Sequence, residues 1–197
     1  MDDIAKTAFE KFETLLRTFI PGCIFITALL LAGKGSEIAG FLGNSDAKWA
    51  MAAMLMGVVL YGFHYGVLED FFTKWTIRRA RNKEPALIPK ERSSDSDVEI
   101  LAWMSQERWA RPVATDVRAK SHQRHLAKQY DWLIFLYCTA YALAASAAVV
   151  WCSKTSVRTG LTLLVLAAVF LFAAMRADLS VTRKELWLNT RFPQHIE

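Results

Sequence analysis

The chain has 197 residues, 53% of them hydrophobic, and its 24 Lys and Arg against 19 Asp and Glu give a net charge of +5. Its mean hydropathy is +0.18, and long uncharged apolar runs alternate with densely charged stretches. This pattern excludes an ordinary soluble globule and a disordered chain, because neither concentrates its apolar residues in this way. The composition therefore predicts a membrane protein.

The first 17 residues are expected to lie on the membrane surface. Apolar side chains recur at helical spacing at Ala5, Phe9, Phe12 and Leu16, and charged residues occupy the rest of the helical wheel. This pattern predicts an interfacial amphipathic helix over residues 1–17. The acidic residues near the start, and the lack of a small-residue cleavage site, argue against a signal peptide.

Four uncharged apolar segments follow, at residues 18–33, 49–68, 132–152 and 159–175. A helix rises about 1.5 Å per residue, so roughly 20 apolar residues cross the hydrocarbon core of a bilayer. We therefore predict an all-α polytopic membrane protein with four transmembrane helices in two hairpins. The first hairpin spans residues 18–70 and the second spans residues 131–176.

The distribution of positive charge predicts how the helices are oriented. Each of the two short loops within a hairpin holds two Lys or Arg, whereas the segment between the hairpins holds thirteen. Cytoplasmic loops retain positive charge. We therefore expect a multi-pass protein of the cell inner membrane, with residues 71–130 and both termini in the cytoplasm.

The basic segment over residues 71–130 is predicted to be largely helical. The second span has no helix breaker at its end, so we expect it to continue into the cytoplasm, followed by a loop rich in Pro and Ser over 83–96. Ser96 and Glu99 form a capping box that starts a new helix, and Pro112 stops it. A further helix beginning near Asp116 leads into the third span. With the tail at 177–197, these helices are expected to form a small cytoplasmic layer.

Part of this segment is too apolar for a solvated loop, which predicts a buried contact or a docking surface for a protein partner. The candidate partner-binding residues are Trp103, Met104, Arg108, Trp109 and Arg111. Positive charges beside a span also attract anionic lipids of the inner leaflet, which explains much of the run from Lys74 to Lys83. Nucleic acid is disfavoured as a partner, because acidic residues interrupt the basic ones.

Small residues within the spans predict close helix packing, because lipid provides no hydrophobic drive between helices. They serve either to pack this chain's own bundle or to form a seam between copies in a homo-oligomer. The candidate helix-packing residues are Gly57, Gly62, Gly66, Ala140, Ala144 and Ala148.

His64 is the only ionisable side chain inside a predicted span, which makes it the intramembrane candidate for function, on one arc with Tyr61 and Tyr65. A hydrogen bond to a tyrosine, Thr139 or Ser146 would instead give it a structural role. His122 and His125 share a helix face, but no third metal ligand is evident. The sequence predicts no metal, cofactor or catalytic residue, and we expect no enzymatic activity.

In size and in its layout of four helices, the chain resembles small four-pass membrane subunits of bacterial phage-defence systems. This architectural resemblance implies a membrane sensor or a membrane-disrupting effector. Two functions follow from the sequence. The first is an oligomeric membrane anchor or sensor that recruits a cytoplasmic protein, and the alternative is an oligomeric pore or channel.

Overall fold

A computed structural model describes residues 17–34, 40, 43, 45–110, 117–154 and 156–191, and the side chains of 33, 34, 108–110, 117–120, 123 and 124 are not included. The amphipathic helix predicted before Arg17 and the end of the predicted tail lie outside these residues. Every regular element in the described part is helical. This confirms the all-α prediction.

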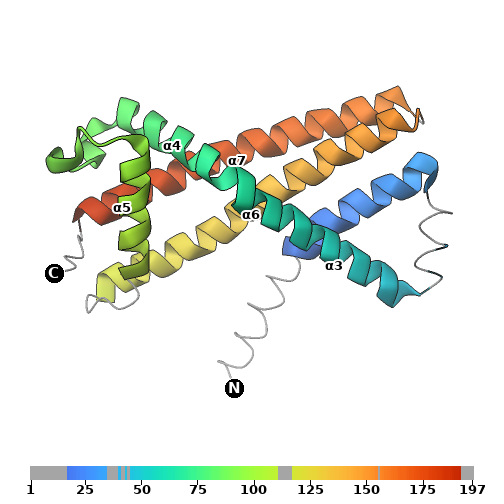
Figure 1. The fold of residues 1–197 in the computed structure, drawn as a ribbon, viewed down its shortest axis with the longest axis horizontal. Helices are drawn as coiled ribbons and strands as arrows, with labels where there is room; N and C mark the ends of the chain where they lie inside the picture. The colour runs from blue at the N-terminus through green and yellow to red at the C-terminus, as the bar shows by residue number, and fades with distance from the viewer. Residues whose placement is uncertain are drawn as a thin grey trace, which may run out of the picture. The chain divides into compact units, whose positions relative to one another are not determined.

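The helices follow the chain in the order drawn in Figure 1. An apolar helix over Arg17–Ala32 comes first, and its last turn overlaps the π-helix η1 (Leu30–Lys34). The other elements are α3 (Asp46–Phe63), the π-helix η2 (His64–Leu68), α4 (Glu69–Lys83), the 3-10 turns η3 (Pro85–Leu87) and η4 (Lys90–Arg92), α5 (Asp97–Ala110), α6 (Val117–Cys152) and α7 (Val157–Arg191).

Three of these helical stretches are long and apolar enough to cross a membrane, namely Asp46–Lys83, His125–Cys152 and Val157–Arg191. They contain the second, third and fourth predicted spans. The helix over Arg17–Ala32 is apolar but shorter than the roughly 20 residues that a full crossing needs. The predicted continuation of the second span as a helix, up to Lys83, is confirmed.

The chain divides into two compact units. The first comprises Met1–Gly66 and Ile134–Ala174 and is called the apolar unit below. The second comprises Val67–Leu133 and Met175–Glu197 and is called the polar unit. The chain passes from one unit to the other within helical stretches, each time close to an end of a predicted span.

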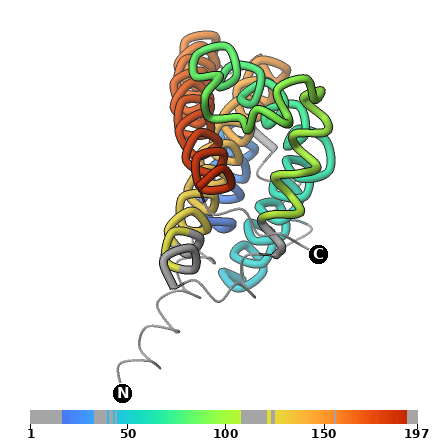
Figure 2. Tube along the Cα trace, turned by 90° about the vertical axis from the view of Figure 1, so that its left-hand side faces the viewer, coloured from blue at the N-terminus to red at the C-terminus, as the bar shows by residue number. Residues whose placement is uncertain are grey.

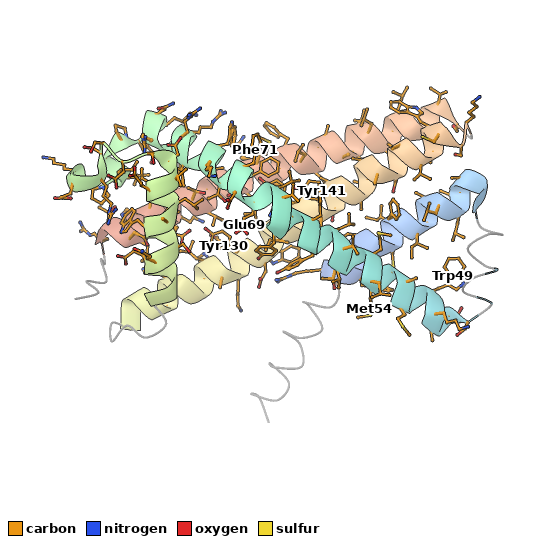
Figure 3. All side chains as sticks on the ribbon, in the orientation of Figure 1. Trp49, Met54, Glu69, Phe71, Tyr130 and Tyr141 are labelled. Carbon is orange, nitrogen blue, oxygen red and sulfur yellow. The ribbon has the colours of Figure 1, made fainter. Side chains whose placement is uncertain are left out.

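Large hydrophobic side chains face outward in the apolar unit. Helix α3 buries only Ala53 and Gly57, whereas Leu55 on the same helix is 62% exposed. Figure 3 shows Met54 projecting away from α3. Helix α7 likewise exposes Val165 and Phe172. Contiguous exposed apolar surface of this kind is what lipid contact requires.

Helix α6 forms the centre of the apolar unit. In its most apolar window 61% of residues are buried, against 17% in the corresponding window of α7. The two helices are joined by a short turn in which Lys154 has a positive φ of 54°, and they lie side by side on either side of it (Figures 1 and 2). Trp151 closes this turn by packing against Gly160.

The first helix and α3 approach backbone to backbone. A Cβ added to Gly22 would lie 1.8 Å from the carbonyl oxygen of Ala53, and one added to Gly57 would lie 1.8 Å from that of Thr18. Each pair, Thr18 with Gly22 and Ala53 with Gly57, is spaced by four residues, as in small-residue motifs of membrane helices. Glycine is therefore required at both positions of this crossing.

The polar unit has a hydrophobic core of its own. It is formed by α4, the 3-10 turns, α5 and the end of α7, with Ile77, Ala80, Ile88, Ile100, Trp103, Met104 and Leu186 buried in one cluster. A second cluster joins Leu126 of α6 to Val181 and Leu188 of α7. The segment therefore folds as a packed helical unit.

The variant Gly57→Ala should lower the thermal stability of the protein in detergent or nanodiscs, because its methyl group collides with the Thr18 carbonyl. Overpacking at such a contact costs about 1–3 kcal/mol. Val165→Ala is the control within the same unit, because Val165 is 62% exposed on α7. Equal unfolding midpoints for the two variants would contradict this crossing.

Candidate functional site

His64 lies in the interior of the apolar unit, 3% exposed, at the start of η2. Its Nδ1 is 3.1 Å from the hydroxyl oxygen of Tyr141. Its ring stacks on Tyr137 with 4.7 Å between centroids and 25° between planes. Two tyrosines of α6 thus hold the imidazole from one neighbouring helix.

Tyr61 and Tyr65 occupy a different environment. Both rings are exposed, and their hydroxyl oxygens lie 3.3 Å apart. The ring of Tyr65 also meets the ring of His64 edge to face, with 5.8 Å between centroids. The structure therefore pairs the two tyrosine hydroxyls on the outside, keeps Tyr65 in contact with the imidazole, and brings His64 to Tyr137 and Tyr141.

The placement of His64 beside Tyr141 suits a hydrogen bond with a structural role. A neutral imidazole offers one donor and one acceptor, and a tyrosine hydroxyl can satisfy either. The π-helix also leaves the backbone ladder irregular at this point, and a buried polar contact can stabilise such a turn. Two other partners were suggested. Ser146 donates instead to the carbonyl oxygen of Ala142 at 2.6 Å, and the buried hydroxyl of Thr139 makes no hydrogen bond among the described residues.

The small residues predicted to pack helices are divided between the interior and the outside. Gly57 lies in the helix crossing, and Ala140 is buried. No atom lies within 4 Å of a Cβ placed on Gly62 or Gly66. Ala144 and Ala148 are likewise exposed.

Two of the residues predicted to bind a partner take the buried contact that was the other prediction for this segment. Trp103 is 7% exposed and Met104 is 0% exposed, because both fill the core of the polar unit. Their apolar surface is used within the chain, so a docking role for these two side chains gives way to a core role. The side chains of Arg108 and Trp109, and all of Arg111, lie outside the described part, and their role stays a prediction.

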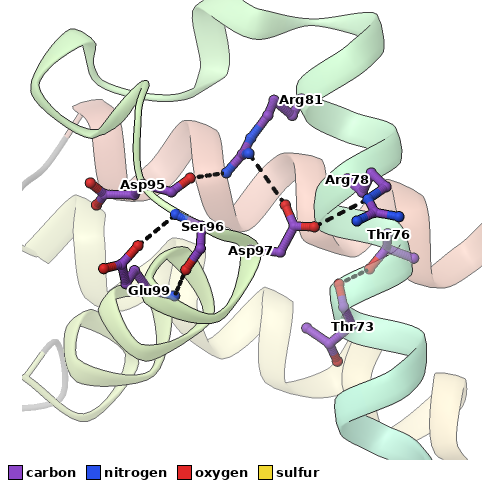
Figure 4. Close-up of polar contacts among 8 residues, drawn as sticks. All are labelled: Thr73, Thr76, Arg78, Arg81, Asp95, Ser96, Asp97 and Glu99. Carbon is purple, nitrogen blue, oxygen red and sulfur yellow. Dashed lines mark hydrogen bonds and ion pairs between the residues drawn. The ribbon is translucent and has the colours of Figure 1, made fainter.

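Charged residues fasten α4 to the start of α5 (Figure 4). Asp97 forms ion pairs with Arg78 at 3.2 Å and with Arg81 at 3.4 Å. Arg81 also donates to the carbonyl oxygen of Asp95 at 2.7 Å. The carboxylate of Asp97 is only 18% exposed, and Arg81 at 29% exposed is better shielded from solvent than Arg78 at 74%. The pair with Arg78 is therefore in the range of surface ion pairs, which contribute about 0–1 kcal/mol.

The predicted capping box is confirmed at the start of α5. The backbone N–H of Ser96 donates to the Glu99 carboxylate at 2.6 Å, and the Glu99 N–H donates to the Ser96 hydroxyl at 3.3 Å. The hydrogen bonds from Ser96 favour the charged form, so they hold the pKa of Glu99 below its ordinary value.

Polar residues are buried along one face of α7, which the sequence analysis did not anticipate. They are Asp178, Thr182, Glu185 and Asn189. Thr182 lies 3.1 Å from Thr76 of α4, and Tyr130 of α6 donates a hydrogen bond to Glu185. The spacing of four, three and four residues is the signal that marks one helix face.

Comparison with protein-family models, with curated proteins and with solved structures finds no match to this chain. Among the described residues, no group of three or more His, Cys, Asp or Glu is placed to hold a metal ion.

The variant Tyr141→Phe should destabilise the apolar unit, because it leaves a buried nitrogen of His64 without its hydrogen-bond partner. The expected loss is about 1 kcal/mol, measured as a lower unfolding midpoint in detergent. Tyr65→Phe is the control, since it removes a hydroxyl from an exposed pair. A larger loss for Tyr65→Phe would contradict the placement of His64.

The capping box should make stability depend on pH. A lowered folded pKa means that Glu99 stabilises the protein above the ordinary glutamate pKa of about 4.3, and that this contribution disappears as the pH falls through the folded pKa. Glu99→Gln keeps the side-chain shape without the charge. Wild type should therefore unfold at a higher temperature at pH 7, and the difference should shrink as the pH falls below the ordinary glutamate pKa and vanish below the folded pKa. A difference that is constant with pH would refute this assignment.

Proposed function

We propose that this protein is a membrane anchor or sensor subunit whose polar unit recruits a protein partner in the cytoplasm. In this proposal the helix over Arg17–Ala32 joins the three longer stretches in a four-pass arrangement in the inner membrane, with both termini inside. The thirteen Lys and Arg between the second and third spans support this orientation.

The folded polar unit is the observation that carries the proposal. A stretch that served only to attract lipid would need positive charge but no core. This one buries Ile77, Ile100 and Leu186 together and fixes α5 to α4 through Asp97. Such a rigid surface is pre-organised for binding, which lowers the entropic cost of holding a partner.

The same unit offers a surface for anionic lipids. Arg78 keeps 74% of its side chain exposed, and Arg79 lies over the ring of Trp75 at 5.2 Å. Positive charges beside a membrane are worth about 1 kcal/mol each at an anionic leaflet. Lipid contact would orient the polar unit, and the partner would bind on the part of its surface that faces away from the membrane.

Oligomerisation is supported by the small residues left on the outside of the apolar unit. Among the residues that the structure describes, none comes within 4 Å of a Cβ placed on Gly62 or Gly66, and a glycine pair at this spacing lets two membrane helices approach closely. We propose that a second copy packs there. A resemblance to four-pass subunits of phage-defence systems supports the same class of role.

The alternative, an oligomeric pore, has less support. His64 packs against Tyr137 and Tyr141 of its own chain, so its side chain is committed to an internal contact. A pore-lining role would require that contact to open.

The native mass of the tagged protein, extracted gently from its own host membrane, tests the proposal. We expect a native mass that exceeds a whole multiple of the chain mass of 22.3 kDa, because another polypeptide is bound. Multiples of the chain mass alone, together with ion conductance in liposomes, would instead establish the pore.

Cysteine labelling on intact cells tests the orientation in the same strain. The exposed native Cys152 should react with a membrane-impermeant maleimide from outside. A cysteine placed at the exposed Ser94, in a chain with Cys152→Ser, should react only after the membrane is opened. The reverse pattern would overturn the proposed topology.

A further inference from the structure

A pocket of about 260 Å³ lies between α6 and α7 within the polar unit. It is lined by His122, His125, Leu126, Lys184, Trp187 and Leu188. The surface of its wall is almost entirely carbon, supplied by the two leucines, the aromatic rings and the stem of the lysine. The volume falls just below the roughly 300–1,000 Å³ of drug-sized sites, so the pocket can hold one flat ring system such as a purine.

Aromatic rings from both helices shape the wall. The ring of His122 meets Trp187 edge to face, with 5.9 Å between centroids. Trp187 is 44% exposed, so its indole is available to a ligand. A flat ring can stack on such a surface, as nucleobases stack on aromatic side chains.

The polar groups at the pocket are held in place by a chain of hydrogen bonds. Lys184 Nζ donates to Gln129 Oε1 at 3.2 Å. Gln129 Nε2 lies 3.1 Å from His125 Nε2. An amide nitrogen only donates, so His125 accepts through Nε2 and, when neutral, carries its proton on Nδ1. The ammonium group is thereby fixed beside the pocket.

The surrounding charge favours an anion. From Val117 to Tyr130 the chain has four Lys or Arg and two His and no acidic residue. On α7 the nearby carboxylate of Glu185 is buried and accepts a hydrogen bond from Tyr130. Among the described side chains that line the pocket, Lys184 is the one that carries a permanent charge, and that charge is positive.

We propose that this pocket binds a small aromatic anion, a ring bearing a phosphate group, with the ring against Trp187 and the phosphate facing Lys184. An apolar wall alone would accept any hydrophobic group. The fixed lysine and the absence of acidic residues along the start of α6 select for negative charge.

The distance of the pocket from the membrane favours a soluble organophosphate over a lipid headgroup as the ligand. On the proposed placement in the membrane, Trp132 marks the inner edge of the hydrocarbon. His125 lies seven residues before Trp132 on α6, which places it about 10 Å from this edge on the cytoplasmic side. The headgroup layer adds only about 5–8 Å on each side of the hydrocarbon. The choice of source rests on the proposed function, whereas the binding chemistry does not.

Equilibrium dialysis with radiolabelled adenosine monophosphate tests the site, using the full chain in nanodiscs of neutral lipid. Binding is expected, and it should be stronger than binding of adenosine or of inorganic phosphate. Lys184→Gln should weaken it about tenfold or more, since it removes a charge-assisted contact. Trp187→Leu should weaken it about fivefold or more. Lys128→Gln is the matched control, because Lys128 is exposed on α6 outside the pocket lining.

Unfolding midpoints equal to that of wild type establish that the variants are folded. Absence of nucleotide binding, or equal weakening by Lys184→Gln and Lys128→Gln, would overturn the proposal. Nanodiscs containing phosphatidic acid distinguish the sources. If this lipid displaces the nucleotide and its binding depends on Lys184, the lipid is the ligand and the soluble source is refuted. Failure to find a protein partner would refute the proposed function and leave these results standing.

Discussion

The reversal of polarity along α7 is the constraint on which the rest of the structure depends. In the apolar unit this helix exposes side chains such as Val165 and Phe172, a surface that only lipid covers without cost. In the polar unit the same helix buries Asp178 and Glu185. Buried polar groups must find hydrogen-bond partners, so the neighbouring helices of the polar unit have to supply them.

Those partners come from segments far apart in the sequence. Thr76 of α4 meets Thr182, and Tyr130 of α6 meets Glu185. Thr190 donates to the carbonyl oxygen of Leu87 at 2.8 Å. Directional contacts of this kind specify one arrangement more strictly than apolar packing alone. They explain how a stretch of chain rich in charged residues forms a defined unit.

Local patterns in the sequence were sufficient to predict the helices. Runs of uncharged residues marked the long apolar helices, and Ser96 with Glu99 marked the start of α5, because both signals lie within a few neighbouring residues. The partner of His64 was predicted only as a class of residue. A pairing between residues 64 and 141 depends on how two helices are rotated against each other, which periodicity does not specify.

Trp103 is a second example of a contact whose partner the sequence does not specify. An apolar residue in a charged segment predicts burial, but the sequence does not say whether the covering surface belongs to this chain or to a partner. The structure answers for Trp103, which packs in the core with Arg92 over its ring at 5.2 Å. The partner surface is therefore to be sought among exposed residues of the polar unit.

Helices α6 and α7 would give the polar unit a physical basis for the proposed role as a sensor. Lys184 and Trp187 line the pocket on one face of α7, while Glu185 between them holds α6 through Tyr130 on the other. A ligand that contacts both helices stabilises the arrangement in which they are packed, by an amount set by its concentration relative to its dissociation constant. Occupancy of the pocket would therefore favour one conformation of the same unit that is proposed to hold the partner.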